Sequence, residues 1–252
     1  MTEVDLKGTV TLVTGASSGI GAAVAQVLAA RGSAVALVAR REDRLTALAE
    51  QLTAAGGRAL PVPADVADAD QARAAVEQAV DTWGRLDILV NNAGVAQHAP
   101  MVDASVADWE HMVRVNLLGT LYCAHAALPH LIRAAESDPR HVADLVNVSS
   151  LSGRIALKNS GVYSATKHAL NAYSESLRQE VAGRRVRVSL LEPAAVTTEL
   201  FPRQIREAMT AGTRPYERLS AMDVADAVEY VVTRPAHAAV SELLIRPSES
   251  ER

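Results

Sequence analysis

Short apolar runs alternate along the chain with longer segments whose apolar residues recur at helical spacing. The apolar runs predict seven strands, at Val10–Val13, Val35–Val38, Ala59–Val62, Ile88–Val90, Leu145–Val148, Val186–Leu191 and Leu243–Ile245. The segments between them predict helices at Ile20–Arg31, Arg44–Ala55, Gln71–Thr82, Val106–Ala135, Tyr163–Ala182 and Val224–Val232. Because proline lacks a backbone N–H, we expect the long fourth helical segment to be interrupted near Pro129.

The predicted strands are continuously apolar rather than alternating. Such strands are buried on both faces, as happens when crossover helices cover both sides of a parallel sheet. The pattern therefore predicts an α/β fold, a doubly wound, seven-stranded parallel sheet with helices on both faces. Since the pattern contains no internal repeat or linker, we expect a single domain spanning residues 1–252.

Two segments fit neither pattern. Ser137–His141 is a polar insertion, and the region 197–222 is long and rich in Arg, Thr, Gly and Pro. Long loops in compact domains are commonly functional, which makes 197–222 a candidate substrate loop; the alternative is a surface excursion. Its apolar residues would either face a substrate or anchor the loop to the core: Leu200, Phe201, Ile205 and Met209.

Composition narrows the possible partners. Of 252 residues, 49% are hydrophobic and 21% charged, which excludes disorder as the main state. A net charge of −4 and only 3% aromatic residues argue against nucleic acid, which needs basic and base-stacking surfaces. The single cysteine, Cys123, lies in an apolar run, where we expect an inert thiol. The histidines lack metal-ligand spacing, so no metal site is predicted.

The N-terminal part of the sequence bears on location. Met1–Asp5 lacks the basic-then-apolar order of a signal peptide, and a lone cysteine fits a reducing compartment, so we predict a cytoplasmic protein. Gly8–Ala30 contains no charge and is long enough for a membrane span. The polar turn Thr14–Gly19 divides it into a strand and a helix, so we expect no membrane partner.

A glycine-rich turn joins the first predicted strand to the first helix. It contains six candidate cofactor-binding residues: Gly15, Ser17, Ser18, Gly19, Ile20 and Gly21. A helix start at the carboxyl edge of a parallel sheet presents free N–H groups and a positive dipole, which suit a pyrophosphate. Gly15 allows the tight turn, Gly19 lets phosphates approach the backbone, and Gly21 lets the helix pack closely on the strand.

The second predicted strand ends in two arginines, Arg40 and Arg41. Arg40 comes 19 residues after Gly21, close to the interval of about 20 at which an acidic residue binds a ribose 2′-hydroxyl. The strand end has no acid, and guanidinium groups favour a 2′-phosphate through charge-assisted bidentate bonds. We therefore predict NADP(H) over NAD(H). The alternative is a solvated arginine pair at a strand end.

A second group of polar residues lies in the later half of the chain. Tyr163 and Lys167 are four residues apart at the start of a predicted helix and share one face of it. Ser150 follows the fifth predicted strand, at the same sheet edge as the glycine turn. A Tyr–Lys pair at this spacing is common by chance and would also be explained by core packing. Its combination with the glycine turn, Asn91–Gly94 and Ser150 is far more specific.

The order of these motifs closely resembles the short-chain dehydrogenase/reductase family over nearly the whole chain. The resemblance implies a Rossmann-type domain in which Tyr163 is the general acid or base. Lys167 would bind the nicotinamide ribose and lower the pKa of the tyrosine. Ser150 would bind the substrate oxygen, and Asn116 would sustain a proton-relay water. The resemblance also implies cofactor contacts by Asp65, Val66, Asn91, Asn92, Ala93, Gly94, Pro193, Val196 and Thr197.

Three features depart from the family pattern. Ala194 stands where many members have a glycine after Pro193, and the insertion Ser137–His141 lengthens the approach to the fifth strand. The C-terminal sequence Leu244–Pro247 lacks the glycine pair that is frequent in the family. This last feature resembles the NADP-dependent clavulanate-dehydrogenase-like branch.

The resemblance implies an NADPH-dependent carbonyl reductase or alcohol dehydrogenase acting on a small-molecule ketone or aldehyde, of the kind found in secondary metabolism. One alternative is a 3-oxoacyl-thioester reductase, for which Arg203, Arg206 and Arg214 would form a basic patch for an acyl carrier. Another is a non-catalytic NADP-binding regulatory protein. Because family members pair through helices like 106–135 and 163–182, we expect a homodimer or homotetramer.

Overall fold

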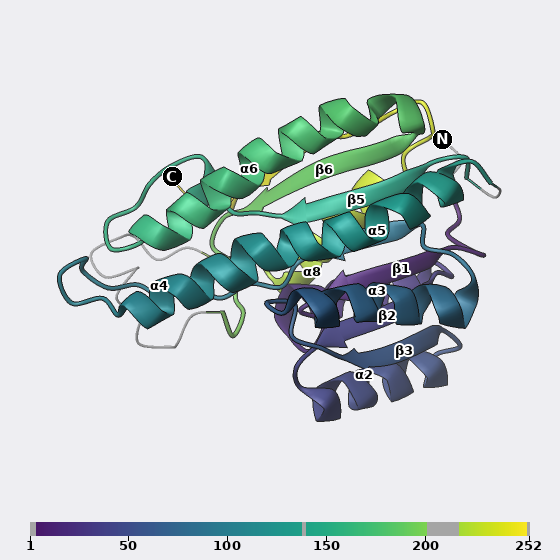
Figure 1. The fold of residues 1–252 in the computed structure, drawn as a ribbon, viewed down its shortest axis with the longest axis horizontal. Helices are drawn as coiled ribbons and strands as arrows, with labels where there is room; N and C mark the ends of the chain where they lie inside the picture. The colour runs from purple at the N-terminus through teal and green to yellow at the C-terminus, as the bar shows by residue number, and fades with distance from the viewer. Residues whose placement is uncertain (1–3, 138–139, 201–216, 251–252) are drawn as a thin grey trace.

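The protein is built on one parallel sheet. The computed structural model describes residues 4–137, 140–200 and 217–250. In these ranges the strands are β1 (Val10–Thr14), β2 (Ala34–Ala39), β3 (Arg58–Pro63), β4 (Ile88–Asn91), β5 (Ala143–Val148), β6 (Val186–Pro193) and β7 (Glu242–Ile245). They lie in the order β3-β2-β1-β4-β5-β6-β7, so the chain reverses its direction of travel between β1 and β4. All strands run in the same direction, so their carboxyl ends meet at one edge of the sheet (Figure 1). In folds of this kind ligands bind at that edge, at the switch point.

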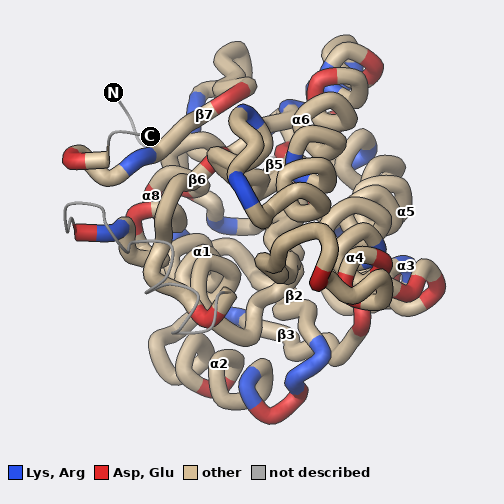
Figure 2. Tube along the Cα trace, turned by 90° about the vertical axis from the view of Figure 1, so that its left-hand side faces the viewer, with Lys and Arg blue, Asp and Glu red and all other residues tan. Residues whose placement is uncertain are grey.

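Helices cover both faces of the sheet, which confirms the predicted doubly wound architecture. The main helices are α1 (Gly19–Ala30), α2 (Glu42–Ala54), α3 (Ala69–Trp83), α4 (Val106–Val113), α5 (Gly119–Ala135), α6 (Gly161–Val181) and α8 (Ala221–Val232). One face packs against α3, α5 and α6, and the other against α1, α2 and α8 (Figure 1). Basic and acidic positions are interspersed along the described chain (Figure 2).

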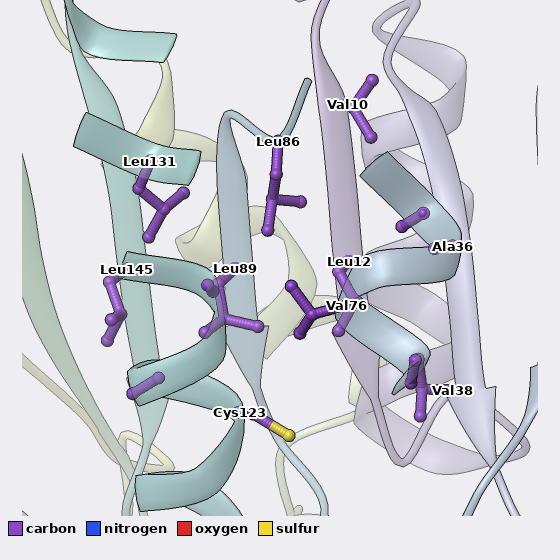
Figure 3. Close-up of a cluster of buried hydrophobic side chains, with 14 of the residues drawn as sticks. Val10, Leu12, Ala36, Val38, Val76, Leu86, Leu89, Cys123, Leu131 and Leu145 are labelled. Atoms are coloured by element: carbon purple, nitrogen blue, oxygen red, sulfur yellow. The ribbon is translucent and has the colours of Figure 1, made fainter. Parts of the chain in front are cut away.

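The two-sided covering explains why the strands are continuously apolar. Leu12 and Leu89 point into the cluster beneath α3 and α5 (Figure 3). Their neighbours Val13 and Val90 belong to the cluster on the opposite face. All four side chains are fully buried, so a polar residue at any of them would lose hydration on either face. Cys123 belongs to the first cluster, where burial raises the pKa of its thiol to about 12, consistent with the predicted inert group.

The predicted interruption at Pro129 is wrong. Helix α5 runs through Pro129, because Ala127 and Leu131 on either side of it stay buried against the sheet and offset the lost hydrogen bond. The irregularity lies earlier, in a π-helical turn over Arg114–Leu118 that joins α4 to α5. A π turn contains one extra residue, so it changes which face α4 presents relative to α5.

The combined helix Val106–Ala135 is long and apolar enough, by length and composition, to cross a membrane. In the structure 44% of its most apolar window is buried within the protein. A core helix passes the same test, and α5 packs on the sheet beside α3 and α6 (Figure 1).

A buried charged cluster joins β5, β6 and α8 at the amino edge of the sheet. Asp144 accepts hydrogen bonds from Arg187 at 2.7 and 3.0 Å and from Arg140 at 3.0 Å. Both arginines also donate to the carbonyl oxygen of Val232 at the end of α8. All three charged side chains are almost completely buried, so each depends on the others for compensation.

We expect Asp144→Ala to lower the free energy of unfolding by about 3–5 kcal/mol, because it leaves two buried guanidinium groups without a counter-charge. Glu175→Ala is the matched control, since it removes an exposed carboxylate paired with Arg178 and should lower the free energy of unfolding far less. Denaturant unfolding measures both. Equal losses in the two variants would contradict a structural role for the cluster.

Candidate active site

A cavity of about 630 Å³ lies along the carboxyl edge of the sheet. It brings together most of the predicted site residues: Gly15, Ser17, Ser18, Gly19, Ile20, Arg40, Arg41, Asp65, Val66, Asn92, Ala93, Gly94, Ser150, Tyr163, Lys167, Pro193 and Val196. Gly21, Asn91, Asn116 and Thr197 do not line it. The segments after β1, β2, β3, β4, β5 and β6 all contribute, as expected at the switch point of a doubly wound sheet.

The glycine turn forms a cradle that only small residues allow. Gly15 and Gly19 have φ of +68° and +55°, in the left-handed region. A Cβ on Gly21 would come within 2.4 Å of the Gly15 carbonyl oxygen, so Gly21 serves the close packing of α1 on β1 rather than the cavity itself. Among the described residues no side chain caps α1, and its first turn has no acid. The free N–H groups at its start therefore fit a pyrophosphate.

The turn after β4 is braced against the glycine turn. The Thr14 hydroxyl accepts hydrogen bonds from the backbone N–H groups of Asn92 and Ala93, both at 3.0 Å. The Asn92 amide donates to the Thr14 carbonyl oxygen at 2.9 Å. These three bonds hold the ends of β1 and β4 together, so that both turns line one continuous groove.

The arginines predicted for a 2′-phosphate lie at the rim of the cavity. Both Arg40 and Arg41 are exposed there. Arg41 is held against the glycine turn by hydrogen bonds to the hydroxyl groups of Ser17 (2.9 Å) and Ser18 (2.7 Å). The Arg41 guanidinium group thus lies next to the predicted pyrophosphate site, on the side where the adenosine ribose of a dinucleotide would lie.

Tyr163 and Lys167 are buried side by side at the other end of the cavity. Each is 5% exposed, and the Lys167 ammonium lies 5.9 Å from the centre of the tyrosine ring. The prediction that Lys167 lowers the pKa of Tyr163 is wrong in this structure. Burial raises the pKa of Tyr163, and the opposing effect comes from its hydrogen bond with Ser150. Lys167 donates instead to the Val148 carbonyl oxygen at 2.9 Å.

Asn116 occupies the π-helical turn and is buried. Its amide oxygen accepts from the Val95 N–H at 2.8 Å, and its amide nitrogen donates to the Val95 carbonyl oxygen at 2.9 Å. A weaker bond reaches the Thr166 hydroxyl on α6 at 3.3 Å. The side chain therefore fixes the segment that follows Gly94. A role in a proton relay stays a prediction.

Residues 196–198 leave β6 beside the cavity, but not in the predicted way. The Thr197 N–H donates to the Leu219 carbonyl oxygen at 2.8 Å, next to a bridge between Val196 and Leu219. This pairing fixes Thr197 away from the cavity lining, and Thr198 lines it instead. The shift of one residue follows from a partner about twenty residues further along the chain, which the motif itself does not reveal.

A buried polar network behind Ser150 was not predicted. Glu192, the residue before Pro193, is fully buried and accepts from Arg154 at 2.6 Å and from Asn171 at 2.7 Å. Asn171 also accepts from the Ser149 hydroxyl at 2.7 Å. The network ties the segment after β5 to α6 and β6, and so supports Ser150. In the sequence, the only sign of this network was the acidic residue Glu192 at the end of an apolar run.

His98 is a second unpredicted residue of the cavity. Its ring lies 6.1 Å from the Tyr163 ring, and its Nδ1 is 2.5 Å from the Ser160 hydroxyl. Burial lowers the pKa of His98, which keeps the imidazole neutral at neutral pH. The residue follows Asn91–Gly94 by a few positions, so only the placement of the next loop could have identified it.

A dinucleotide cradle at the switch point of a doubly wound sheet defines a Rossmann-type protein that binds a nucleotide cofactor. A family model described as short chain dehydrogenase matches residues 9–208. The chain belongs to the short-chain dehydrogenase/reductase family and is an oxidoreductase. An uncharacterized oxidoreductase of Staphylococcus epidermidis is 38% identical over 244 residues, which cover 96% of this chain and 98% of that protein.

Solved structures show the same relationship. A short chain dehydrogenase from Burkholderia cenocepacia, in complex with NADP, is 30% identical with a TM-score of 0.85 and covers 96% of this chain and 97% of its own. An alcohol dehydrogenase from the archaeon Thermococcus sibiricus, complexed with 5-hydroxy-NADP, is 28% identical with a TM-score of 0.84, covering 97% and 98%.

The burial of Lys167 predicts a distinctive pH dependence of stability. Burial lowers the pKa of Lys167 from 10.5 to about 8, so between these values the unfolded chain binds the proton more readily. The free energy of unfolding should therefore rise, relative to Lys167→Met, by about 2 kcal/mol from pH 7.5 to pH 9.5. Denaturant unfolding at both pH values measures this. Lys158→Met, which removes an ammonium group from an exposed side chain, is the control. A flat Lys167 comparison would contradict the burial.

Proposed function

We propose that the protein is an NADPH-dependent carbonyl reductase, or in reverse an alcohol dehydrogenase, for small-molecule ketones or aldehydes. The observation that supports this most strongly is the arrangement of one cavity. Ser150, Tyr163 and Lys167 lie at one end of it, and the glycine cradle and Arg41 lie at the other. The NADP complexes of related structures support the same cofactor.

The cofactor, when bound, supplies the hydride that reaches the carbonyl carbon. Tyr163 then supplies a proton to the carbonyl oxygen. Because burial raises the pKa of Tyr163, its hydroxyl is protonated at neutral pH, as a general acid must be. Ser150, already hydrogen-bonded to that hydroxyl, holds the substrate oxygen. Lys167 would bind the ribose hydroxyls beside Tyr163 and keep the cofactor in place.

The substrate end of the cavity is mainly apolar. Ala96, Met112 and Tyr163 form a small buried cluster, against which Leu200 packs. Polar residues also line the cavity close to this cluster, among them Gln97 and His98. We propose that this end accepts a compact apolar body next to the carbonyl group. Phe201, Ile205 and Met209 of the predicted substrate loop lie outside the described residues.

Arg203, Arg206 and Arg214, which would receive an acyl carrier in a thioester reductase, lie outside the described residues. The regulatory alternative is disfavoured because Ser150, Tyr163 and Lys167 all meet in the cavity. Several predictions made from the sequence stay predictions. They are a single domain over residues 1–252, a homodimer or homotetramer, a cytoplasmic location, and the absence of nucleic-acid and membrane partners. The resemblance to the clavulanate-dehydrogenase-like branch also stays a prediction.

We expect Tyr163→Phe to lower NADPH consumption with a panel of ketones and aldehydes by about 10²–10⁴-fold, because the proton donor is lost. NADPH binding, measured by fluorescence titration, should change little. Tyr173→Phe loses the same hydroxyl from the same helix, away from the cavity, and should keep full activity.

Two outcomes would contradict the proposal. If Tyr163→Phe turns over as fast as the parent, the assigned acid is wrong. If the parent binds NADPH but none of the carbonyl compounds in the panel leads to NADPH consumption, the regulatory alternative is favoured. Acyl-carrier thioesters belong in the panel, since a strong preference for them over free ketones would favour the thioester reductase.

Cofactor choice gives a separate prediction. Arg41→Gln should weaken NADPH binding about tenfold through loss of a charge-assisted contact, while NADH binding stays within about twofold. Fluorescence titration of both cofactors, without substrate, measures the ratio. Equal weakening of the two cofactors would mean that Arg41 only supports the glycine turn.

A further inference from the structure

An acidic side chain from a distant segment reaches the predicted 2′-phosphate site. Glu199 follows β6, and its carboxylate accepts a hydrogen bond from Arg41 at 3.1 Å. Arg44 on the first turn of α2 donates to both oxygens of the same carboxylate, at 3.0 and 2.9 Å. Figure 2 shows the short run of basic and acidic positions at the start of α2.

Glu199 lies next to the glycine cradle. Its neighbour Thr198 packs over the start of α1, where a Cβ on Gly19 would lie 3.2 Å from the threonine methyl carbon. Glu199 therefore lines the cavity at the rim shared with Arg40 and Arg41. The two arginines hold the pKa of Glu199 below its ordinary value, so the carboxylate is charged at neutral pH.

Two cofactors would meet this carboxylate differently. A 2′-phosphate carries a charge of roughly −1.5 to −2 and needs the donors of Arg41 and Arg44 that Glu199 holds. A ribose 2′-hydroxyl is uncharged and can donate a hydrogen bond to a carboxylate, the contact that an acid at the end of β2 makes in NAD-binding proteins. The strand end of this chain has arginine there, and Glu199 brings an acid to the same rim.

We propose that Glu199 is a specificity-determining residue, whose carboxylate competes with the 2′-phosphate for Arg41 and Arg44 and narrows the preference for NADP(H) over NAD(H). Arg44 thereby becomes a third arginine of the 2′-phosphate site. This inference rests on the proposed function, because it requires a nicotinamide dinucleotide in the cavity.

Dissociation constants of NADPH and NADH, from fluorescence titration without substrate, test the proposal. Glu199→Gln should tighten NADPH binding about three- to fivefold and leave NADH binding unchanged or slightly weaker. The effect should shrink at high salt, because the groups are exposed. It should also shrink when Arg41 and Arg44 are both replaced by Gln, since the carboxylate acts through them.

Glu50→Gln is the matched control, since it removes the same charge from the exposed face of α2 outside the cavity. Neither dissociation constant should change in that variant. If Glu199→Gln changes the dissociation constants of NADPH and NADH equally, Glu199 only holds its segment in place. If the variant binds NADPH more weakly, Glu199 positions the arginines for the phosphate. Either result overturns the inference.

The proposed function fails separately. If the parent chain binds neither NADPH nor NADH, both proposals are wrong. If the parent binds NADPH and the NADPH-to-NADH ratio is the same in Glu199→Gln, only the role of Glu199 is refuted.

Discussion

The site depends on the backbone contact between the first helix and the first strand. A side chain on Gly21 would collide with the Gly15 carbonyl oxygen and with the Asn92 amide, so α1, β1 and the turn after β4 approach each other at one point. That approach turns the start of α1 toward the cavity and aligns it with the ends of five other strands. The apolar layers on both sides hold the sheet rigid enough to keep this geometry.

Short-range patterns predicted most of the fold. Apolar runs and helical spacing located all seven strands, because each strand must be buried on two faces and each helix on one. The glycine turn and the Tyr163–Lys167 pair were equally visible, since their geometry is fixed within a few residues. Pro129 misled the prediction because packing of its neighbours, not local hydrogen bonding, decides whether the helix continues.

What the sequence could not reveal depends on contacts between distant segments. Glu199 and Arg41 are 158 residues apart, and Arg154 and Glu192 are 38 apart. The direction of the Tyr163 pKa shift also needed the structure, because spacing places Lys167 near the ring but does not give burial or show that its ammonium turns to Val148. Charge on a helix face is readable from sequence, whereas desolvation is not.

The Arg140–Asp144–Arg187 cluster lies at the amino edge, and the cavity at the carboxyl edge, of the same strands. The amino ends of β5 and β6 thus hold the buried charged cluster, and their carboxyl ends lead into the cavity. No residue of the cluster lines the cavity, so side chains at the cavity can change without removing a contact of the cluster, and the scaffold can keep its stability while the site varies. In this chain, the common direction of the strands separates the residues that anchor the sheet from the residues that line the cavity.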